Sequence, residues 1–134
     1  FTRAGDFTVY GTAGITDRLN AEQLVIIHIE GRRGLENLEE IIETPHLDVI
    51  FLGPYDLSQS FGIPGQVNDP RVVQGMEQAV AKIRAAGKAA GTFAADVPTA
   101  KRWLDVGVQY MSLGVDVGIF ARACAEIVQQ VRQG

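Results

Sequence analysis

Two acidic residues, Glu30 and Asp56, close two successive apolar stretches of the chain and are the residues best suited to chemistry. The stretches begin at Leu24 and at Val49, and the two carboxylates are separated by 26 residues, which fits one strand–helix unit. In a parallel α/β protein both would lie at the C-terminal rim of adjacent strands, where active sites of such folds are found. Two rim carboxylates without a nearby Cys ligand suit a hard divalent cation such as Mg²⁺ or Mn²⁺.

Each of these residues also has a purely structural explanation. Glu30 could be a general base or simply the polar end of a strand, and Asp56 could cap a short turn over residues 57–60. The pair is more informative than either residue, because two rim carboxylates repel each other unless a cation or a proton lies between them. His28 shares a strand face with Glu30. It is either a packed neutral histidine or a group that orients water or a ligand beside Glu30.

A turn and an aromatic residue accompany the carboxylates. Gly53, Pro54 and Tyr55 form a turn whose backbone N–H groups could hold an anion, although Pro54 contributes no N–H. Phe93 ends a later strand, where it either forms the wall of a substrate pocket or belongs to the core. These residues complete the candidate site.

The elements that must position these residues alternate between strand and helix. We predict strands at residues 24–30, 48–52, 88–93 and 110–113, and helices at about 35–43, 69–86, 96–106 and 118–133. This alternation predicts an α/β fold with a parallel sheet and right-handed crossovers. Four strand–helix units are half of an eight-stranded barrel, which usually needs roughly 250 residues. Residues 1–20 show no steady period, so we expect an irregular arm or the remnant of a preceding element, followed by a half-barrel over residues 21–134.

The composition of the 134-residue chain excludes several classes of partner. Its formal net charge is −4 and it has no dense basic run, which argues against nucleic acid and against an anionic membrane surface. Its apolar runs are too short to span a membrane. Cys124 is the only cysteine; we expect it to be buried on the last helix, and a reducing cytoplasm is its natural setting. Because the chain begins with Phe1 rather than Met, we expect a fragment or a processed product.

Four short motifs then occur in the order typical of one family. They are Ile29-Glu30 followed by Gly34, Gly53-Pro54-Tyr55-Asp56-Leu57-Ser58, Ala86-Gly87-Lys88 and Gly114-Val115-Asp116. From about residue 24 to its end the chain resembles the metal-dependent (class II) pyruvate aldolases of the hydroxy-oxo-heptanedioate aldolase type, in the citrate-lyase-beta-like superfamily. The resemblance implies the second half of a (β/α)8 TIM barrel. It also implies a homo-oligomer built on dimers, commonly a hexamer, with the last helix exchanged between partners.

The resemblance also implies roles for individual residues. Glu30 and Asp56 would hold Mg²⁺, Mn²⁺ or Co²⁺, which would polarise the ketone of bound pyruvate. Backbone groups around Gly53 and Tyr55 would receive the pyruvate carboxylate, and Tyr55 and Phe93 would line the aldehyde side. The expected substrate-binding residues are His28, Gly53, Pro54, Tyr55 and Phe93. The implied reaction is the reversible aldol cleavage of a 4-hydroxy-2-oxo acid to pyruvate and a small aldehyde.

This chain departs from the family pattern at several positions. The family usually has Gln in place of His28, so the contact to substrate or to a metal-bound water is altered. It often has a small residue in place of Tyr55, so the aldehyde pocket is reshaped. The family's catalytic Arg and His–Asp pair lie in the first half of the barrel, and no part of this chain matches them. Since proton transfer contributes about 10²–10⁴ in rate, this chain alone should be nearly inactive. Two alternatives stay open: a lyase acting on an acyl-CoA such as a malyl or citramalyl thioester, and a non-catalytic half-barrel that serves as an assembly module.

Overall fold

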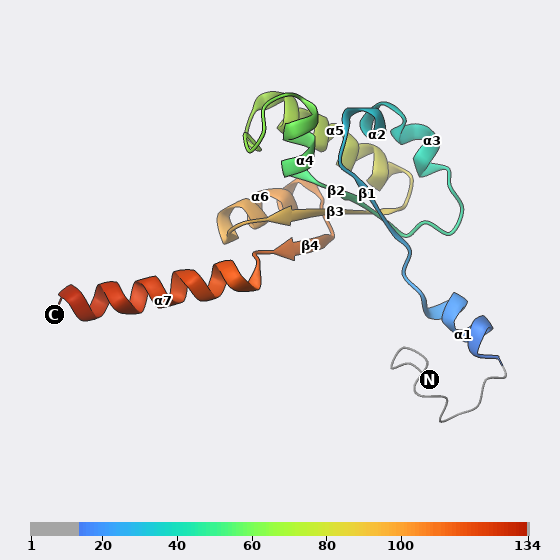
Figure 1. Ribbon diagram of the computed structural model, residues 1–134. Helices are drawn as coiled ribbons and strands as arrows, with labels where there is room; N and C mark the ends of the chain where they lie inside the picture. The colour runs from blue at the N-terminus through green and yellow to red at the C-terminus, as the bar shows by residue number, and fades with distance from the viewer. Residues whose placement is uncertain (1–13, 134) are drawn as a thin grey trace.

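A computed structural model describes residues 14–133, and its centre is a parallel sheet flanked by helices (Figure 1). The strands are β1 (Ile26–Ile29), β2 (Val49–Leu52), β3 (Ala89–Ala94) and β4 (Tyr110–Leu113). They lie in the order β1-β2-β3-β4, and every neighbouring pair is parallel. All four residues of β2 are buried, which explains why this strand is continuously apolar in the sequence. The predicted fold of consecutive strand–helix units is confirmed.

Helices connect these strands. The helices predicted over residues 69–86 and 96–106 begin within one residue of the predicted positions. The helices are α1 (Ile15–Glu22), α2 (Arg32–Glu36), α3 (Leu38–Ile42), α4 (Pro54–Ser60), α5 (Pro70–Ala85), α6 (Val97–Val106) and α7 (Asp116–Gln133). Asp69 and Asp96 cap α5 and α6 by accepting backbone N–H groups, and each helix has a proline in its first turn. The side chain and the backbone N–H of Arg71 both donate to the Asp69 carboxylate, which lowers the pKa of Asp69 to about 2. The cap of α5 therefore stays ionised well into the acidic range.

Three local predictions differ from the structure. The helix predicted over residues 35–43 is two short helices, because Asn37 leaves the helical region between them (φ −96°, ψ 12°) and a short polar side chain favours that departure. The turn predicted at residues 53–56 is the first turn of α4, because Pro54 has its φ preset for the first helical position. Residues 15–20, predicted to be irregular, belong to α1. Only Ile15 and Leu19 are apolar at helical spacing there, which is too little to predict a helix. Residues 1–13 of the predicted arm lie outside the described residues.

The core forms where α5 packs against the sheet. The apolar stripe predicted on α5 is buried at five of its positions: Val72, Met76, Ala79, Val80 and Ile83. These side chains belong to one cluster with Ile50 and Leu52 of β2 and Trp103 of α6. This packing holds the helical side of the sheet and so supports the strand ends at which the candidate site is predicted.

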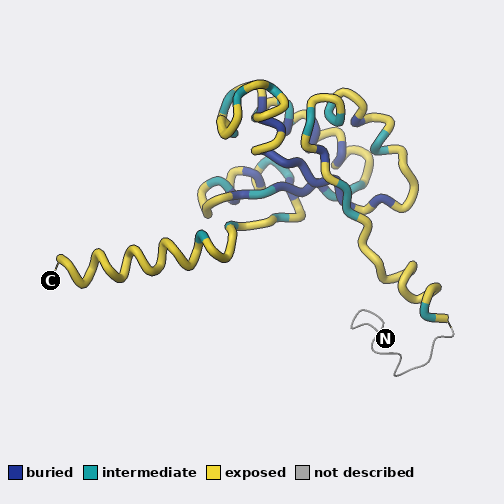
Figure 2. The backbone as a smooth tube through the Cα atoms, viewed as in Figure 1, coloured by how far each residue is buried: buried dark blue, intermediate teal, exposed yellow. Residues whose placement is uncertain are grey.

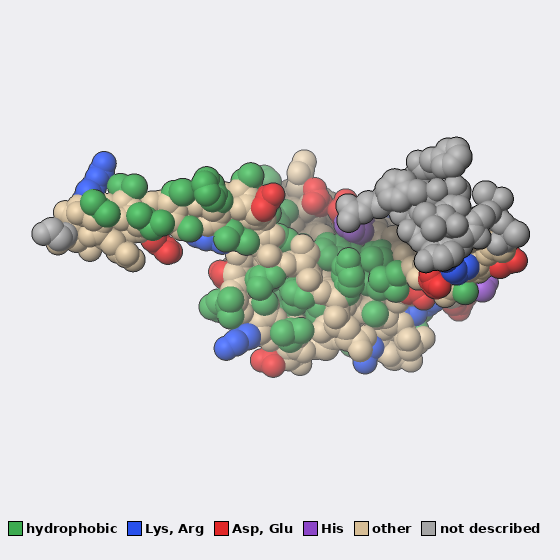
Figure 3. All heavy atoms as spheres, turned by 90° about the horizontal axis from the view of Figure 1, so that it is seen from below, with side chains coloured by type: hydrophobic (Ala, Val, Ile, Leu, Met, Phe, Trp, Pro, Cys, Tyr) green, Lys and Arg blue, Asp and Glu red, His purple; other side chains and the backbone are tan. Residues whose placement is uncertain are grey.

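The last helix, α7, extends away from the sheet rather than packing on it (Figures 1 and 2). None of its residues is buried. Its exposed apolar side chains include Phe120 (71% exposed) and Val131 (77% exposed). Hydrophobic side chains are visible along the projecting helix at the left of Figure 3. Cys124 is therefore exposed, and the prediction that it is buried is wrong, because the helix face that carries it has no packing partner within residues 14–133. Among the described helices, none combines the length and apolar character needed to cross a membrane.

We expect Met76→Ala to lower the free energy of unfolding by about 2–5 kcal/mol, because the Met76 side chain is fully buried in the core and its loss leaves a cavity. Met76→Leu nearly conserves volume and should cost less than about 1.5 kcal/mol. Urea denaturation of both variants measures the difference. Equal costs for the two substitutions would contradict the packing described for α5.

Candidate functional site

The C-terminal ends of β1 and β2 bring Glu30 against Gly53. The strand register pairs Ile29 with Leu52, so the residues that follow them lie side by side. The Gly53 N–H donates to the Ile29 carbonyl oxygen at 3.1 Å, which closes the two strand ends together. A Cβ atom placed on Gly53 would lie 2.9 Å from Glu30 Cγ and 3.3 Å from Glu30 Oε1. The Glu30 side chain thus lies across Gly53, in space that a larger residue would occupy.

Asp56 comes from the helix that begins at this same glycine. Gly53 is the N-cap of α4, and Asp56 lies in the first turn, where the helix dipole favours a negative charge. Asp56 is exposed, and the Glu30 side chain is 48% exposed. Both predicted ligands are therefore at one rim of the sheet and open to solvent. Their role as metal ligands stays a prediction.

The donor set at this rim fits a cation that takes few protein ligands. Among residues 14–133, no group of three or more His, Cys, Asp or Glu side chains could hold a metal ion. A carboxylate pair would therefore leave the other coordination positions to water and substrate. Mg²⁺ behaves in this way, since it commonly keeps several waters and binds through one or two carboxylates. The residues present fit the predicted Mg²⁺, Mn²⁺ or Co²⁺.

His28 orients Glu30 from the neighbouring position on the same strand face. His28 Nδ1 donates to Glu30 Oε1 at 3.0 Å. The His28 ring stacks on Phe51, with ring centroids 4.6 Å apart and planes inclined by 21°. The His28 side chain is 53% exposed, and whether it orients a water or a ligand beside Glu30 stays a prediction.

The stacked pair continues across the sheet as a row of aromatic residues. The strand registers align His28, Phe51, Gly91 and Tyr110. The rings of Phe51 and Tyr110 meet edge to face at 6.2 Å, and a Cβ atom on Gly91 would lie 2.9 Å from the Phe51 ring. Sequence reasoning missed Phe51. Its pairing with His28 depends on the strand register, which has no local signal in the sequence.

Tyr55, in the first turn of α4, and Phe93, near the end of β3, lie together. Their rings meet edge to face, with centroids 6.0 Å apart. They border two hollows of about 180 Å³ and 360 Å³, and Pro54 lines the smaller one. The predicted substrate-binding residues thus form two groups: His28 and Gly53 around Glu30, and Pro54, Tyr55 and Phe93 around the hollows. Whether any of them binds substrate stays a prediction.

A buried hydroxyl fixes α4, and sequence reasoning missed this as well. Ser58 is fully buried, and its Oγ donates to the Tyr55 carbonyl oxygen at 2.5 Å. The same Oγ accepts the Gly65 N–H at 2.9 Å, which ties the loop after α4 to the helix. Ser58 therefore holds the short helix that carries Tyr55 and Asp56. A serine within a helical stretch carries no sequence signal for this role.

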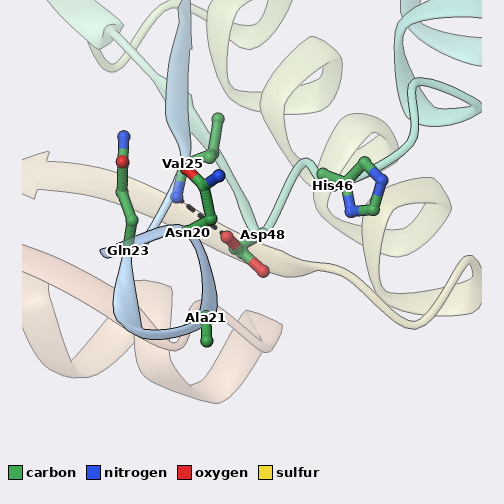
Figure 4. Close-up of a pocket in the computed structure, with 6 residues that line it drawn as sticks. All are labelled: Asn20, Ala21, Gln23, Val25, His46 and Asp48. Carbon is green, nitrogen blue, oxygen red and sulfur yellow. Dashed lines mark hydrogen bonds between the residues drawn. The ribbon is translucent and has the colours of Figure 1, made fainter. Parts of the chain in front are cut away.

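Another hollow, of about 530 Å³, lies at the opposite end of the sheet (Figure 4). Val25 and Asp48 line it and precede β1 and β2, and the Asp48 carboxylate accepts the Val25 N–H at 2.8 Å. His46 is exposed there, as the sequence predicts for the helix-to-strand side. Because sites of parallel α/β folds form at the C-terminal ends of strands, this hollow is not the candidate site.

The chain matches one family of known proteins over most of its length. The sequence model of the family described as HpcH/HpaI aldolase/citrate lyase matches residues 5–123. A 2-keto-3-deoxy-L-rhamnonate aldolase of Klebsiella pneumoniae subsp. pneumoniae is 41% identical over 104 residues, which are 78% of this chain and 39% of that protein. A 4-hydroxy-2-oxo-heptane-1,7-dioate aldolase of Shigella sonnei is 39% identical over 106 residues, 79% of this chain and 40% of that protein.

A solved structure extends the similarity to the fold. The crystal structure of an HpcH/HpaI aldolase/citrate lyase family protein from Burkholderia cenocepacia J2315 matches with a TM-score of 0.90 at 33% identity. The match covers 98% of this chain and 50% of that one. The chain spans about two fifths of the length of the two curated relatives. The four strand–helix units therefore correspond to half of the related structure.

We expect Gly53→Ala to weaken Mn²⁺ binding about 10–100-fold, the usual cost of disturbing the surroundings of a metal ligand, because the new Cβ would displace the Glu30 side chain. Gly31→Ala is the matched control, since Gly31 also adjoins Glu30 but a Cβ there has no heavy atom within 4 Å. Isothermal titration calorimetry with Mn²⁺ measures both. Equal affinities for the two variants would contradict the importance of the close approach at Gly53.

Proposed function

The chain belongs to the HpcH/HpaI aldolase/citrate lyase family, and on that premise we propose that it forms part of an enzyme that cleaves 4-hydroxy-2-oxo acids to pyruvate and an aldehyde. The observation that carries this proposal is the position of Glu30 across Gly53, the residue that begins the helix bearing Asp56. Such a rim can present two carboxylates to one cation. The similarity to two aldolases at about 40% identity supports the reaction class.

We propose Glu30 and Asp56 as the protein ligands of a divalent cation, Mg²⁺, Mn²⁺ or Co²⁺. When bound, the cation would supply a Lewis acid that polarises the 2-oxo group and stabilises the negative charge left by carbon–carbon cleavage. The chain's own contribution is to hold the ligands. His28 fixes one oxygen of Glu30 through its 3.0 Å hydrogen bond, and Gly53 leaves the space in which the Glu30 side chain lies.

The first turn of α4 is the proposed seat of the pyruvate carboxylate. The Gly53 N–H is already bonded to the Ile29 carbonyl oxygen and Pro54 has no N–H, so neither supplies the donor expected at this turn. The next N–H groups along the chain are those of Tyr55 and Asp56, in the first turn of α4. Because the first N–H groups of a helix lack acceptors within the helix, we propose these two as the donors to the carboxylate. The aldehyde portion of the substrate would then extend beside Tyr55 and Phe93.

The proton transfers of this reaction require residues beyond those described. In cleavage the C4 hydroxyl loses its proton, the C3–C4 bond breaks, and its electron pair passes to a pyruvate enolate that takes up a proton at C3. The family resemblance places the catalytic Arg and His–Asp pair in the first half of the barrel, outside the four strand–helix units of this chain. In addition, within residues 14–133 β1 and β4 are the outer strands of the sheet and have no further strand paired to them, as expected for a barrel that needs further strands. We propose that the other half of the barrel supplies both.

We also propose that the enzyme is a homo-oligomer built on dimers through α7. A free helix with a wide apolar face is unfavourable in water, and α7 exposes such a face. A second copy of the chain would cover Phe120, Ile127 and Val131, which recur at helical spacing. The partner proposal rests on this face and on the family resemblance.

We expect Glu30→Gln or Asp56→Asn in the complete enzyme to reduce metal-stimulated pyruvate release about 10²-fold or more, since a Lewis acid contributes several kcal/mol. Glu40→Gln, which changes an exposed carboxylate on α3, is the matched control and should leave the rate unchanged. Pyruvate release from a panel of hydroxy-keto acids gives the rates. Unchanged Mn²⁺ affinity in both site variants would refute the ligand assignment.

We expect Phe120→Asp to shift the enzyme toward smaller assemblies, because it places a charge in the apolar face of α7. Gln129 follows Phe120 by about two and a half helical turns and so lies on the opposite side of α7; Gln129→Asp should leave the assembly intact. Sedimentation velocity at several concentrations measures the molecular mass. Identical masses for both variants would contradict an interface on this face.

A further inference from the structure

Phe51 is buried on the face of the sheet that turns away from α5. Its neighbours along β2, Ile50 and Leu52, belong to the core cluster that packs against α5, whereas Phe51 is not among the described members of that cluster. Successive side chains of a strand alternate between the two faces of a sheet, so Phe51 points to the opposite face. The Phe51 side chain is nevertheless only 8% exposed. Its burial therefore comes from neighbours on its own face of the sheet.

Two rings contact Phe51 on this face. The ring of His28, its partner in the register, stacks on Phe51, and the ring of Tyr110 meets it edge to face. Tyr110 belongs to β4 and reaches across β3 because Gly91 lies between them in the register. A Cβ atom on Gly91 would lie 2.9 Å from Phe51 Cδ2 and 3.2 Å from Tyr110 Cδ1. The missing side chain at Gly91 thus leaves the space in which Phe51 is held beside His28.

The hydrogen bond between His28 and Glu30 depends on this support. The two side chains are 53% and 48% exposed, so water competes for the bond and other staggered rotamers are open to both. Stacking on Phe51, with planes inclined by 21°, restricts the His28 ring while its Nδ1 lies 3.0 Å from Glu30 Oε1. Within residues 14–133, this is the one hydrogen bond found to the Glu30 carboxylate. The position of that carboxylate is therefore linked to the Phe51 ring through a single imidazole.

We infer that Phe51 is a positioning residue, which acts on the proposed metal ligand Glu30 through the ring of His28. A phenyl ring has no atom that could ligate a cation or bond to the carboxylate, so its effect on cation affinity requires the imidazole between them. Groups that hold a metal ligand in place commonly change metal affinity when they are removed. The inference rests on the proposed cation site and names a residue on which the affinity of that site depends.

The test is titration calorimetry of the complete enzyme with Mn²⁺. Phe51→Leu keeps an apolar side chain but removes the aromatic face, and it should weaken Mn²⁺ binding about 10-fold, at the lower end of the usual cost of disturbing the surroundings of a metal ligand. Phe51→Tyr keeps a ring that can stack and should bind Mn²⁺ nearly as tightly as the unmodified enzyme. Ile50→Val is the matched control, because it removes a methyl group from the opposite face of the same strand and should leave the Mn²⁺ affinity unchanged.

A double-mutant cycle with His28 separates positioning from a merely structural role. His28→Ala should itself weaken Mn²⁺ binding, because Glu30 loses its donor. Adding Phe51→Leu to His28→Ala should then cause no further loss, since the ring has nothing left to position. An equal loss from Phe51→Leu with and without His28 would overturn the inference, because Phe51 would then act by another route. An unchanged affinity in Phe51→Leu alone would overturn it as well.

Two further outcomes separate this inference from the proposed function. If Phe51→Leu and Phe51→Met both fail to fold by urea denaturation, Phe51 is structural and the inference is overturned, while the cation site is untouched. If the unmodified enzyme does not bind Mn²⁺, the proposed cation site is overturned and the inference about Phe51 is rejected with it. Mn²⁺ binding by the unmodified enzyme, together with an equal affinity in Phe51→Leu, overturns the inference alone.

Discussion

The candidate site depends on the absence of a side chain at Gly53. Strand register places Glu30 and Gly53 side by side, and the Glu30 side chain occupies the space where a Cβ would be. The same glycine begins α4 and donates its N–H to the end of β1. One residue therefore sets the strand spacing at the rim, the start of the helix that bears Asp56, and the path of the Glu30 carboxylate.

Contacts of neighbouring side chains hold Glu30, Gly53 and α4 in this arrangement. The stacked rings of His28 and Phe51 fix the donor that meets Glu30, and the buried Ser58 hydroxyl fixes α4. The Thr92 hydroxyl donates to the Leu52 carbonyl oxygen at 2.8 Å and is fully buried, which ties β3 to the end of β2. Because α5 packs on the helical side of the sheet, the rim is built on a rigid support. Side chains held in this way would avoid the cost of ordering when the proposed cation binds.

The sequence predicted the elements that repeat and missed those that depend on distant contacts. The strand–helix alternation and the caps at Asp69 and Asp96 are local patterns, so they could be predicted. The shared face of His28 and Glu30 follows from strand period alone. The stacking of Phe51 and the solvent exposure of Cys124 depend instead on register and on where α7 packs, and neither has a local signal.

The central claim is that Glu30 and Asp56 share one divalent cation, and anomalous diffraction from Mn²⁺-soaked crystals of the complete enzyme tests it most directly. The account predicts one anomalous peak at this rim, with an oxygen of each carboxylate at about 2.0–2.2 Å, close to the distances of Mg²⁺ to oxygen ligands and shorter than those of Ca²⁺. A peak bound by only one of the two carboxylates, or no peak beside Gly53, would contradict it.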